Sequence, residues 1–415
     1  MIAWLLISFF VLLFLGVPIA MSLGLSAMGG ILFLGGGSTV TIAQRMFEGM
    51  NSFALLAIPL YTFAGFTMSK GGISKRLMDF CYSIVGHIYG GLAHVNVLSS
   101  MIFAGISGSA VADTAGVSGM FMPEMIRKGY SKNFTVAVTA ISSTIGIIIP
   151  PSIPMVVIAG ICGIIPGILC GLAQMIVSYF LAKKEGVPKE PGHFTIGPVL
   201  HGLWESWPAL LMPIIIVGTI TMGIVSPTEA GVIAVVYGLF AGGIIYRELK
   251  WEDIKFAFAE TVRTSGRIFI VIGAAKLYTV MLTTAGFDKW VAKTMLGFST
   301  NPTVILIMIL LIFFIVTMFM ESIATLTLFM PILYPIALGV GINPIVLSVL
   351  ITVVIGIGLV TPPVGMCIYV ACDLMDTTVG EVFPTLVPFI AATFVCIALM
   401  VAFPQLILLP TYLMA

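Results

Sequence analysis

The sequence is poor in charged residues. Of its 415 residues only 8% are Asp, Glu, Lys or Arg, whereas about 25% is usual in a soluble domain. Hydrophobic residues make up 60% of the chain. So few charges cannot cover a soluble protein of this length, and a net charge of +1 offers no attraction for a nucleic acid. The composition predicts an integral membrane protein with no nucleic-acid partner.

Residues and motifs that carry covalent chemistry are also scarce. The chain has no HExxH, no GxSxG and no nucleotide-binding loop. Its six cysteines form no CxxC pair and lie in apolar stretches, where packing roles are expected. We therefore expect no enzymatic activity, no cofactor and no transition-metal site.

Long apolar runs are abundant instead. Several approach the ~20 residues that cross a hydrocarbon core, and we expect about ten spans in an all-α polytopic protein. Met1–Leu34 is predicted to be one long helix with a weak point at Gly16-Val17-Pro18. Two charged stretches, 71–90 and 251–263, are predicted to be separate amphipathic helices lying in the interface.

An ordered set of motifs occurs twice. Phe121-Met122-Pro123 recurs as Phe329-Met330-Pro331, 208 residues later, and the same offset places Asp113 on Glu321. Pro150-Pro151 recurs as Pro362-Pro363. The order predicts a duplication over 1–206 and 207–415, each half holding scaffold helices and one repeat. The predicted hairpins cover about 92–128 and 302–338, and the predicted broken helices about 133–160 and 343–373.

Basic residues flank only the first copy. Lys70, Lys75 and Arg76 precede its hairpin, Arg127–Lys132 follow it, and no Lys or Arg occurs after Lys293. By the positive-inside rule the first hairpin enters from the cytoplasm and the second from outside. Inverted repeats of this kind are typical of secondary transporters with a site near the bilayer midplane.

Each copy has two polar interruptions. The first hairpin turns at Ser107–Ser109 and the second at 317–322, so both are predicted to be re-entrant. Consecutive prolines then break the following helix, which frees carbonyl oxygens that suit a small alkali cation. Asp113 and Glu321 are expected both to cap their half-helices and to attract that cation, and capping alone is the competing interpretation. Lys276, alone in an apolar run, either contacts an anionic solute, pairs with an acid or reaches the interface.

These motifs resemble the large membrane subunit of tripartite ATP-independent periplasmic (TRAP) transporters, the dicarboxylate and sialic acid permeases. The resemblance covers nearly the whole chain. The matching stretches are 15–20, 44–47, 56–59, 71–74, 105–113, 148–155 and 361–365.

The resemblance implies a sodium-driven elevator transporter in the bacterial inner membrane, with transport and scaffold domains. A transporter of this kind would import a small organic anion (a carboxylate, sialic acid or sulfonate). A separate small four-helix membrane (Q) subunit and a periplasmic substrate-binding protein would be its partners, and Na⁺ its coupling ion. The implied sodium-binding residues are Ser107, Ser109, Gly146, Ile149, Pro150, Glu321, Gly356, Gly358 and Thr361. The implied substrate-binding residues are Asp113, Ser152, Lys276, Thr325 and Pro363.

One connection departs from the family pattern. Between Gly163 and Ile164 the family usually has about ten more residues. A stand-alone ion-coupled transporter of another inverted-repeat family is the second interpretation of the repeat. Such a protein would need no small subunit, so co-purification of one would decide between the two.

The charge pattern makes a prediction about topology. The N-terminus and the loops at 70–76, 127–132, 183–206 and 247–267 should be cytoplasmic, and Ala415 periplasmic, because Lys and Arg are retained inside. A cysteine introduced at Lys189 should therefore resist an impermeant thiol reagent added to intact cells. Labelling of that cysteine from outside would contradict the assignment.

Overall fold

The computed structural model describes residues 1–414 apart from 35–38, 151, 153, 156–161 and 188–194, so Lys189 and Pro151 lie outside the described residues. Throughout that part of the chain the regular structure is helical, with no strand. Six helices are long and apolar enough to cross a membrane, and five apolar helices of 10–17 residues accompany them. This arrangement fits the expected class of all-α polytopic membrane protein.

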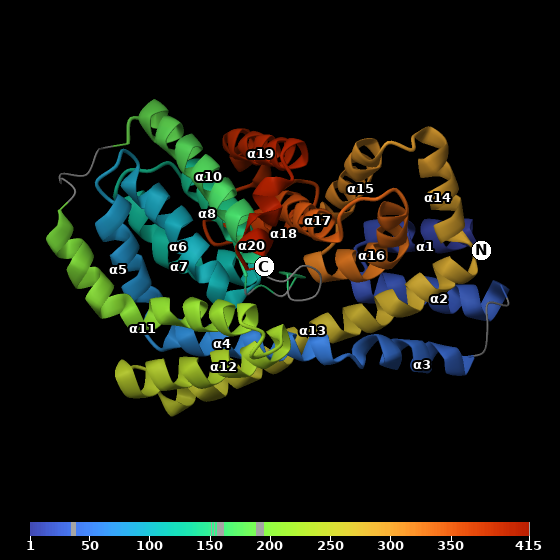
Figure 1. Cartoon of the computed structure of the whole chain (residues 1–415), viewed down its shortest axis with the longest axis horizontal. Coiled ribbons are helices and arrows are strands. Elements are labelled where there is room, and N and C mark those ends of the chain that lie inside the picture. The colour runs from blue at the N-terminus through green and yellow to red at the C-terminus, as the bar shows by residue number, and fades with distance from the viewer. Residues whose placement is uncertain (35–38, 151, 153, 156–161, 188–194, 415) are drawn as a thin grey trace.

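One group of helices runs along the lower part of the molecule, with its members α5 and α1 above it at the left and right (Figure 1). Here α4 packs on α12, α5 on α11, and α2, α3 and α4 on α13. Small residues on α4 and α12 allow the close approach, and Tyr61 fills the space between them. These helices are α1 (Ile2–Phe14), α2 (Ile19–Leu34), α3 (Thr39–Met50), α4 (Ala57–Lys70), α5 (Ile73–Val85), α11 (Ile196–Thr221), α12 (Pro227–Phe240) and α13 (Trp251–Thr284).

A second group lies above it and contains the interrupted helices (Figure 1). Its core interleaves the two halves of the sequence, since α8 and α10 both pack on α19. Its members are α6 (Gly91–Ser107), α7 (Ala110–Arg127), α8 (Lys132–Ser143), η2 (Thr144–Ile147), α10 (Ile164–Glu185), α15 (Pro302–Thr317), α16 (Ser322–Gly339), α17 (Pro344–Gly358), α18 (Met366–Asp373), α19 (Val379–Ala402) and α20 (Gln405–Met414), with α14 (Phe287–Phe298) leading in from α13.

The N-terminal segment differs from the expectation of one long helix. The break at Gly16-Val17-Pro18 is a complete turn, and α1 and α2 pack together as an antiparallel pair. Trp4 of α1 lies against Gly29 of α2, and Leu5 against Gly30. The proline removes one backbone hydrogen-bond donor from the helix. The two glycines allow α1 and α2 to pack closely, and this packing favours the pair over one continuous helix.

The expected separate interfacial helix at 251–263 is also wrong. It continues without a break into the apolar run at 268–284, giving α13 a length of 34 residues. At 1.5 Å per residue this helix is roughly 50 Å long, well beyond the ~30 Å of a hydrocarbon core. No proline or glycine pair interrupts it, so the change from charged to apolar residues alone did not mark a helix end. Residue 206, where the sequence predicts the two halves to meet, lies in α11, and the division into two halves stays a prediction.

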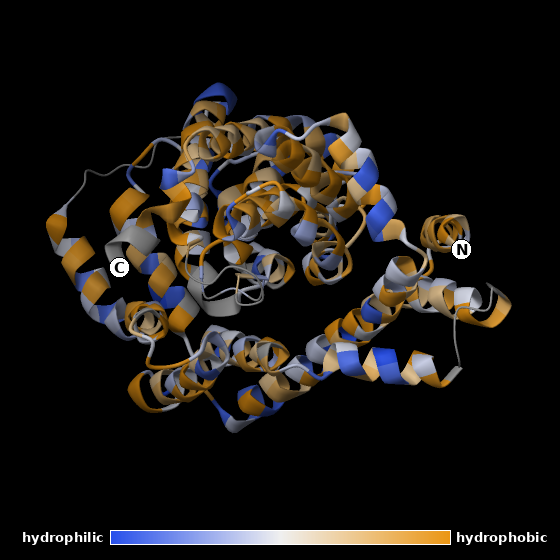
Figure 2. Ribbon diagram, turned by 45° about the vertical axis from the view of Figure 1, so that its right-hand side comes forward, coloured by the Kyte–Doolittle hydropathy of each residue, from blue (hydrophilic) through white to orange (hydrophobic). Residues whose placement is uncertain are grey.

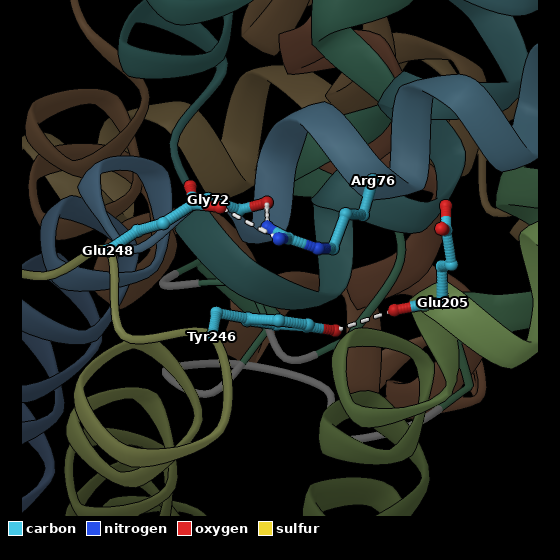
Figure 3. Close-up of polar contacts among 5 residues, drawn as sticks. All are labelled: Gly72, Arg76, Glu205, Tyr246 and Glu248. Atoms are coloured by element: carbon cyan, nitrogen blue, oxygen red, sulfur yellow. Dashed lines mark hydrogen bonds and ion pairs between the residues drawn. The ribbon is translucent and has the colours of Figure 1, made fainter.

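A polar clamp joins α5 to α11 and to the segment after α12 (Figure 3). Arg76 donates to Glu248 at 2.7 Å and to the Gly72 carbonyl at 3.0 Å, and its guanidinium lies 4.1 Å from the ring centre of Tyr246. Burial raises the pKa of Tyr246, so its phenol stays protonated and donates to the Glu205 carbonyl at 3.1 Å. The planar guanidinium thus serves two partners and a ring at once.

The clamp generates a prediction for Gly72. Its φ of +76° favours glycine, and an added Cβ would collide with Glu248. Gly72→Ala should therefore lower the free energy of unfolding by more than the roughly 1–2 kcal/mol that a left-handed alanine alone costs. Thermal melts of the purified protein would measure the loss. Gly186→Ala is the matched control, because Gly186 has a φ of +68° but open space around its Cα. Equal losses for the two variants would show that the clamp does not depend on this close approach.

Candidate functional site

The first hairpin turns at Gly108 and Ser109. Gly108 is buried and adopts a φ of +62°, which ends α6 and lets α7 begin at Ala110. Asp113 lies in the first turn of α7, is only 4% exposed, and donates its backbone N–H to the Ser109 carbonyl at 2.9 Å. A carboxylate is thereby buried one turn beyond the hairpin tip.

That carboxylate lies against the first broken helix. After α8 ends at Ser143, the chain tightens into the 3₁₀ turn η2, and Gly146 of this turn faces Asp113. A Cβ on Gly146 would overlap Asp113 Oδ2. The absence of a side chain at Gly146 is what allows the carboxylate to approach the backbone.

The second broken helix crosses the first at the same place. A Cβ on Gly356 of α17 would lie 3.2 Å from the Cβ and 3.5 Å from the hydroxyl oxygen of Thr144 in η2. The Thr144 hydroxyl donates to the Ile141 carbonyl at 2.7 Å, which leaves its lone pairs available. Residues from the two halves of the sequence therefore face each other across this crossing.

The second hairpin tip is capped by its own acid. The carboxylate of Glu321 accepts from the backbone N–H groups of Ile323 at 2.9 Å and Ala324 at 3.4 Å, and from the Ser322 hydroxyl. The Thr325 hydroxyl donates back to the Glu321 carbonyl at 3.0 Å. Glu321 is thus an N-cap, which is one of the two roles expected of it together; the attraction of a cation stays a prediction.

The backbone after the second proline pair is tied to this tip. Val364 and Gly365 both donate to the Met318 carbonyl, at 3.1 and 3.2 Å. Gly358 lies so close to Thr317 that an added Cβ would be 2.7 Å from the threonine Cβ. Non-helical backbone of the second break is satisfied by the turn of the second hairpin.

Cys367 lies next to the first hairpin. Its buried thiol faces Thr114, the residue after Asp113, where α18 packs on α7. The Thr114 hydroxyl donates to the Ala110 carbonyl at 2.8 Å. The sequence suggested only a packing role for this cysteine. Its position four residues after Pro363 is a signal that could have placed it near the site.

The remaining expected residues are spread around this centre. Ser152 is buried and donates to the Ile147 carbonyl at 2.7 Å, and Thr361 donates to the Ile357 carbonyl at 2.7 Å.

The residues around the two proline pairs and at the first hairpin tip differ in burial. Pro150 is buried, while Ile149 packs on Gly167 of α10. Pro363 joins Pro362 through a cis peptide bond and accepts from Tyr369 at 3.2 Å. The side chain of Ser107 lies outside the described residues, and Ser109 is half-buried.

Lys276 is positioned differently from the others. Its aliphatic stem packs on Gly49 of α3, and a Cβ on that glycine would be 2.5 Å from the lysine Cβ. This contact is on the side of α13 that faces α3.

The chain is similar to proteins of one transporter family. Residues 6–406 match the family described as "Tripartite ATP-independent periplasmic transporter, DctM component". It is 34% identical to the sialic acid TRAP transporter large permease protein SiaM of Vibrio cholerae, over 96% of this chain and 95% of that protein. It is 34% identical to the C4-dicarboxylate TRAP transporter large permease protein DctM of Pseudomonas aeruginosa, over 94% of each.

Two further comparisons concern a longer relative and a solved structure with a similar fold. The isethionate TRAP transporter permease protein DctMQ of Oleidesulfovibrio alaskensis is 35% identical over 92% of this chain, which spans only 62% of that protein. The crystal structure of the Alcanivorax borkumensis YdaH transporter has a TM-score of 0.55 at 13% identity, covering 86% of each chain. This last likeness concerns the fold alone.

The packing of Asp113 on Gly146 can be tested by a double-mutant cycle. Gly146→Ala should lower the free energy of unfolding by about 1–3 kcal/mol, because the new methyl group displaces the carboxylate. Adding Asp113→Ala should recover most of that loss, since the Asp113 Cβ would be 3.8 Å from the new methyl group. Thermal melts in detergent would measure both, with Gly116→Ala, in open space on α7, as control. Strictly additive losses would contradict the contact.

Proposed function

Since the chain belongs to the DctM component family of the TRAP transporters, we propose that it imports a small organic anion across the bacterial inner membrane with sodium as the coupling ion. It is a large permease subunit of a TRAP transporter, a transport protein and not an enzyme. The observation that carries the proposal is the meeting of two hairpin tips and two broken helices in one buried cluster.

The chemistry of this cluster supports sodium. Asp113 contributes a buried carboxylate, Thr144 a hydroxyl whose lone pairs are available, and the broken segments contribute backbone carbonyls. These are hard oxygen ligands, which suit an alkali cation, whereas the soft thiol of Cys367 is engaged with Thr114. One sodium ion would sit between Ser109, Gly146 and Pro150, and a second near Glu321, Gly356 and Thr361.

The charges of the tips suggest how the ion and the solute are coupled. Asp113 and Glu321 would repel an anionic solute as long as neither carboxylate is compensated. Bound sodium would cancel that repulsion and leave the positive ends of α7 and α16 to attract the anion. Cation binding would then precede solute binding, with Ser152, Thr325 and Pro363 close to the solute.

The class of solute is supported by the relatives. Their names specify sialic acid, C4-dicarboxylate and isethionate, which are all small organic anions. We propose a solute of the same class, a carboxylate, sialic acid or sulfonate. A periplasmic binding protein would deliver it.

The two groups of helices support an elevator mechanism. The interrupted helices share one core, which also includes residues of α1, α2 and α13, whereas α4, α5, α11 and α12 share another. The upper group would carry the site as an inverted-repeat transport domain, and the lower group would be the scaffold, buttressed by a separate small membrane subunit. Robust uptake by this polypeptide alone would instead favour a stand-alone transporter.

The proposal is tested by uptake into proteoliposomes that contain the chain, its small subunit and its binding protein, with and without a sodium gradient. Ser109→Ala should weaken the apparent sodium affinity roughly 10- to 150-fold, the effect of losing one charge-assisted contact. Uptake should partly recover at raised sodium, because ion binding and not folding is impaired. Ser8→Ala in α1 is the control. An unchanged sodium dependence with normal expression would mean that the Ser109 hydroxyl only caps the hairpin.

A further inference from the structure

Two buried amide side chains lie next to the first broken helix. Asn96 of α6 and Gln174 of α10 are both fully buried. Most of the ribbon in Figure 2 has the colours of hydrophobic residues, and an amide in such surroundings is unfavourable unless it is hydrogen-bonded. Neither residue is among the predicted ligands of sodium or of the solute, so the polar contacts of both need another explanation.

Asn96 is hydrogen-bonded to α8 through both ends of its amide. Its Nδ2 donates to the Thr139 hydroxyl at 2.7 Å, and its Oδ1 accepts from the Ser142 hydroxyl at 2.9 Å. The Thr139 hydroxyl also donates to the Thr135 carbonyl at 2.8 Å, so it accepts from Asn96, and this sets the orientation of the amide. The Ser100 hydroxyl extends the network by donating to Ser142 at 3.2 Å. Polar contacts therefore join the first arm of the hairpin to the helix that leads into the break.

Gln174 holds the next part of the same segment. Its Nε2 donates to the Ile141 carbonyl at 3.4 Å, and the Thr144 hydroxyl donates to that same carbonyl at 2.7 Å. The shared carbonyl links Gln174 to the Thr144 hydroxyl. Thr144 is the first residue of η2, two residues before Gly146. Helices α6 and α10 thus each hold a residue that lies within three positions of this turn.

The second half of the sequence has apolar residues where the first half has this network. The 208-residue offset of the hairpins places Asn96 on Val304, and the 212-residue offset of the proline pairs places Ser142 on Val354. Residues 304–316 of α15 are all apolar, and α15 packs directly on α17. A hairpin arm can therefore pack on its broken helix without amides, so the fold by itself does not require them in the first half.

We propose that Asn96 and Gln174 are positioning residues for a cation site, which hold the Thr144–Gly146 turn against Asp113. The inference rests on the proposed function, because it concerns the sodium ion that the first half is proposed to bind. A site discriminates between cations of different size only while its oxygens are held at set distances. The two amides supply that constraint through α8, without contributing a ligand.

The test is uptake into the reconstituted transporter, measured against sodium and against lithium concentration. Asn96→Leu removes both contacts but leaves neither partner without an acceptor, because the Thr139 and Ser142 hydroxyls also lie against carbonyls of α8. The variant should weaken the apparent sodium affinity about tenfold, the effect of losing roughly one to two hydrogen bonds. It should also narrow the preference for sodium over lithium, while the KM for the solute at saturating sodium stays unchanged. Gln174→Met should shift the sodium affinity in the same direction by less, since its contact is longer.

A control and a double-mutant cycle separate positioning from general stability. Thr393→Val is the control, because Thr393 is buried and its hydroxyl donates to the Phe389 carbonyl of its own helix, α19, at 3.0 Å. This variant should keep both the sodium affinity and the selectivity. Adding Ser142→Ala to Asn96→Leu should weaken the sodium affinity little further, since the two changes remove one shared contact.

The outcomes distinguish the inference from the proposed function. Uptake by the unaltered transporter that does not depend on sodium would overturn both. A normal sodium dependence that Asn96→Leu and Gln174→Met leave unchanged, in affinity and in selectivity, would overturn the inference alone. A lower maximal rate at an unchanged sodium affinity would equally overturn it, because the network would then only stabilise the fold. If Asn96→Leu does not reach the membrane, Thr139→Val removes one contact at nearly constant shape and carries the same expectation.

Discussion

The structure depends on the rule that backbone polar groups inside a bilayer must be satisfied by protein. Four interruptions of helix lie in its interior; the second hairpin tip satisfies backbone groups of the second break, and the first break satisfies one of its own carbonyls. The Met318 carbonyl at one hairpin tip accepts from Val364 and Gly365 after the proline pair, and Ser152 donates to the Ile147 carbonyl next to the other pair. The breaks are stable because they meet, so the gathering of polar groups that could bind an ion follows from the same rule.

Close approach by glycine determines which groups meet. Gly146 admits the Asp113 carboxylate, and Gly356 admits Thr144, one contact within a half and one between halves. A methyl group at Gly146 would overlap the Asp113 carboxylate, and a methyl group at Gly356 would lie 3.2 Å from the Thr144 Cβ, so Thr144 would have to shift by a few tenths of an ångström. The two glycines therefore set how closely the first hairpin and the two broken helices approach one another.

The sequence predicted the interruptions well and their partners poorly. Proline pairs and a polar Gly–Ser turn are local signals, so the ends of α6, α8, α15 and α17 follow from short windows of sequence. Contacts such as that of Cys367 with Thr114 join segments more than 200 residues apart, and no periodicity within either segment reveals them. The continuous α13 was missed for a different reason: a change in polarity along a helix was mistaken for its end.

Helix α13 joins the two groups of helices. It packs on α2, α3 and α4 of the lower group, and it also packs on α16 of the upper group, whose first turn is capped by Glu321. One continuous helix therefore contacts both groups. The elevator mechanism proposed above requires the upper group to move relative to the lower one, and that movement would have to be accommodated at the contact between α13 and α16.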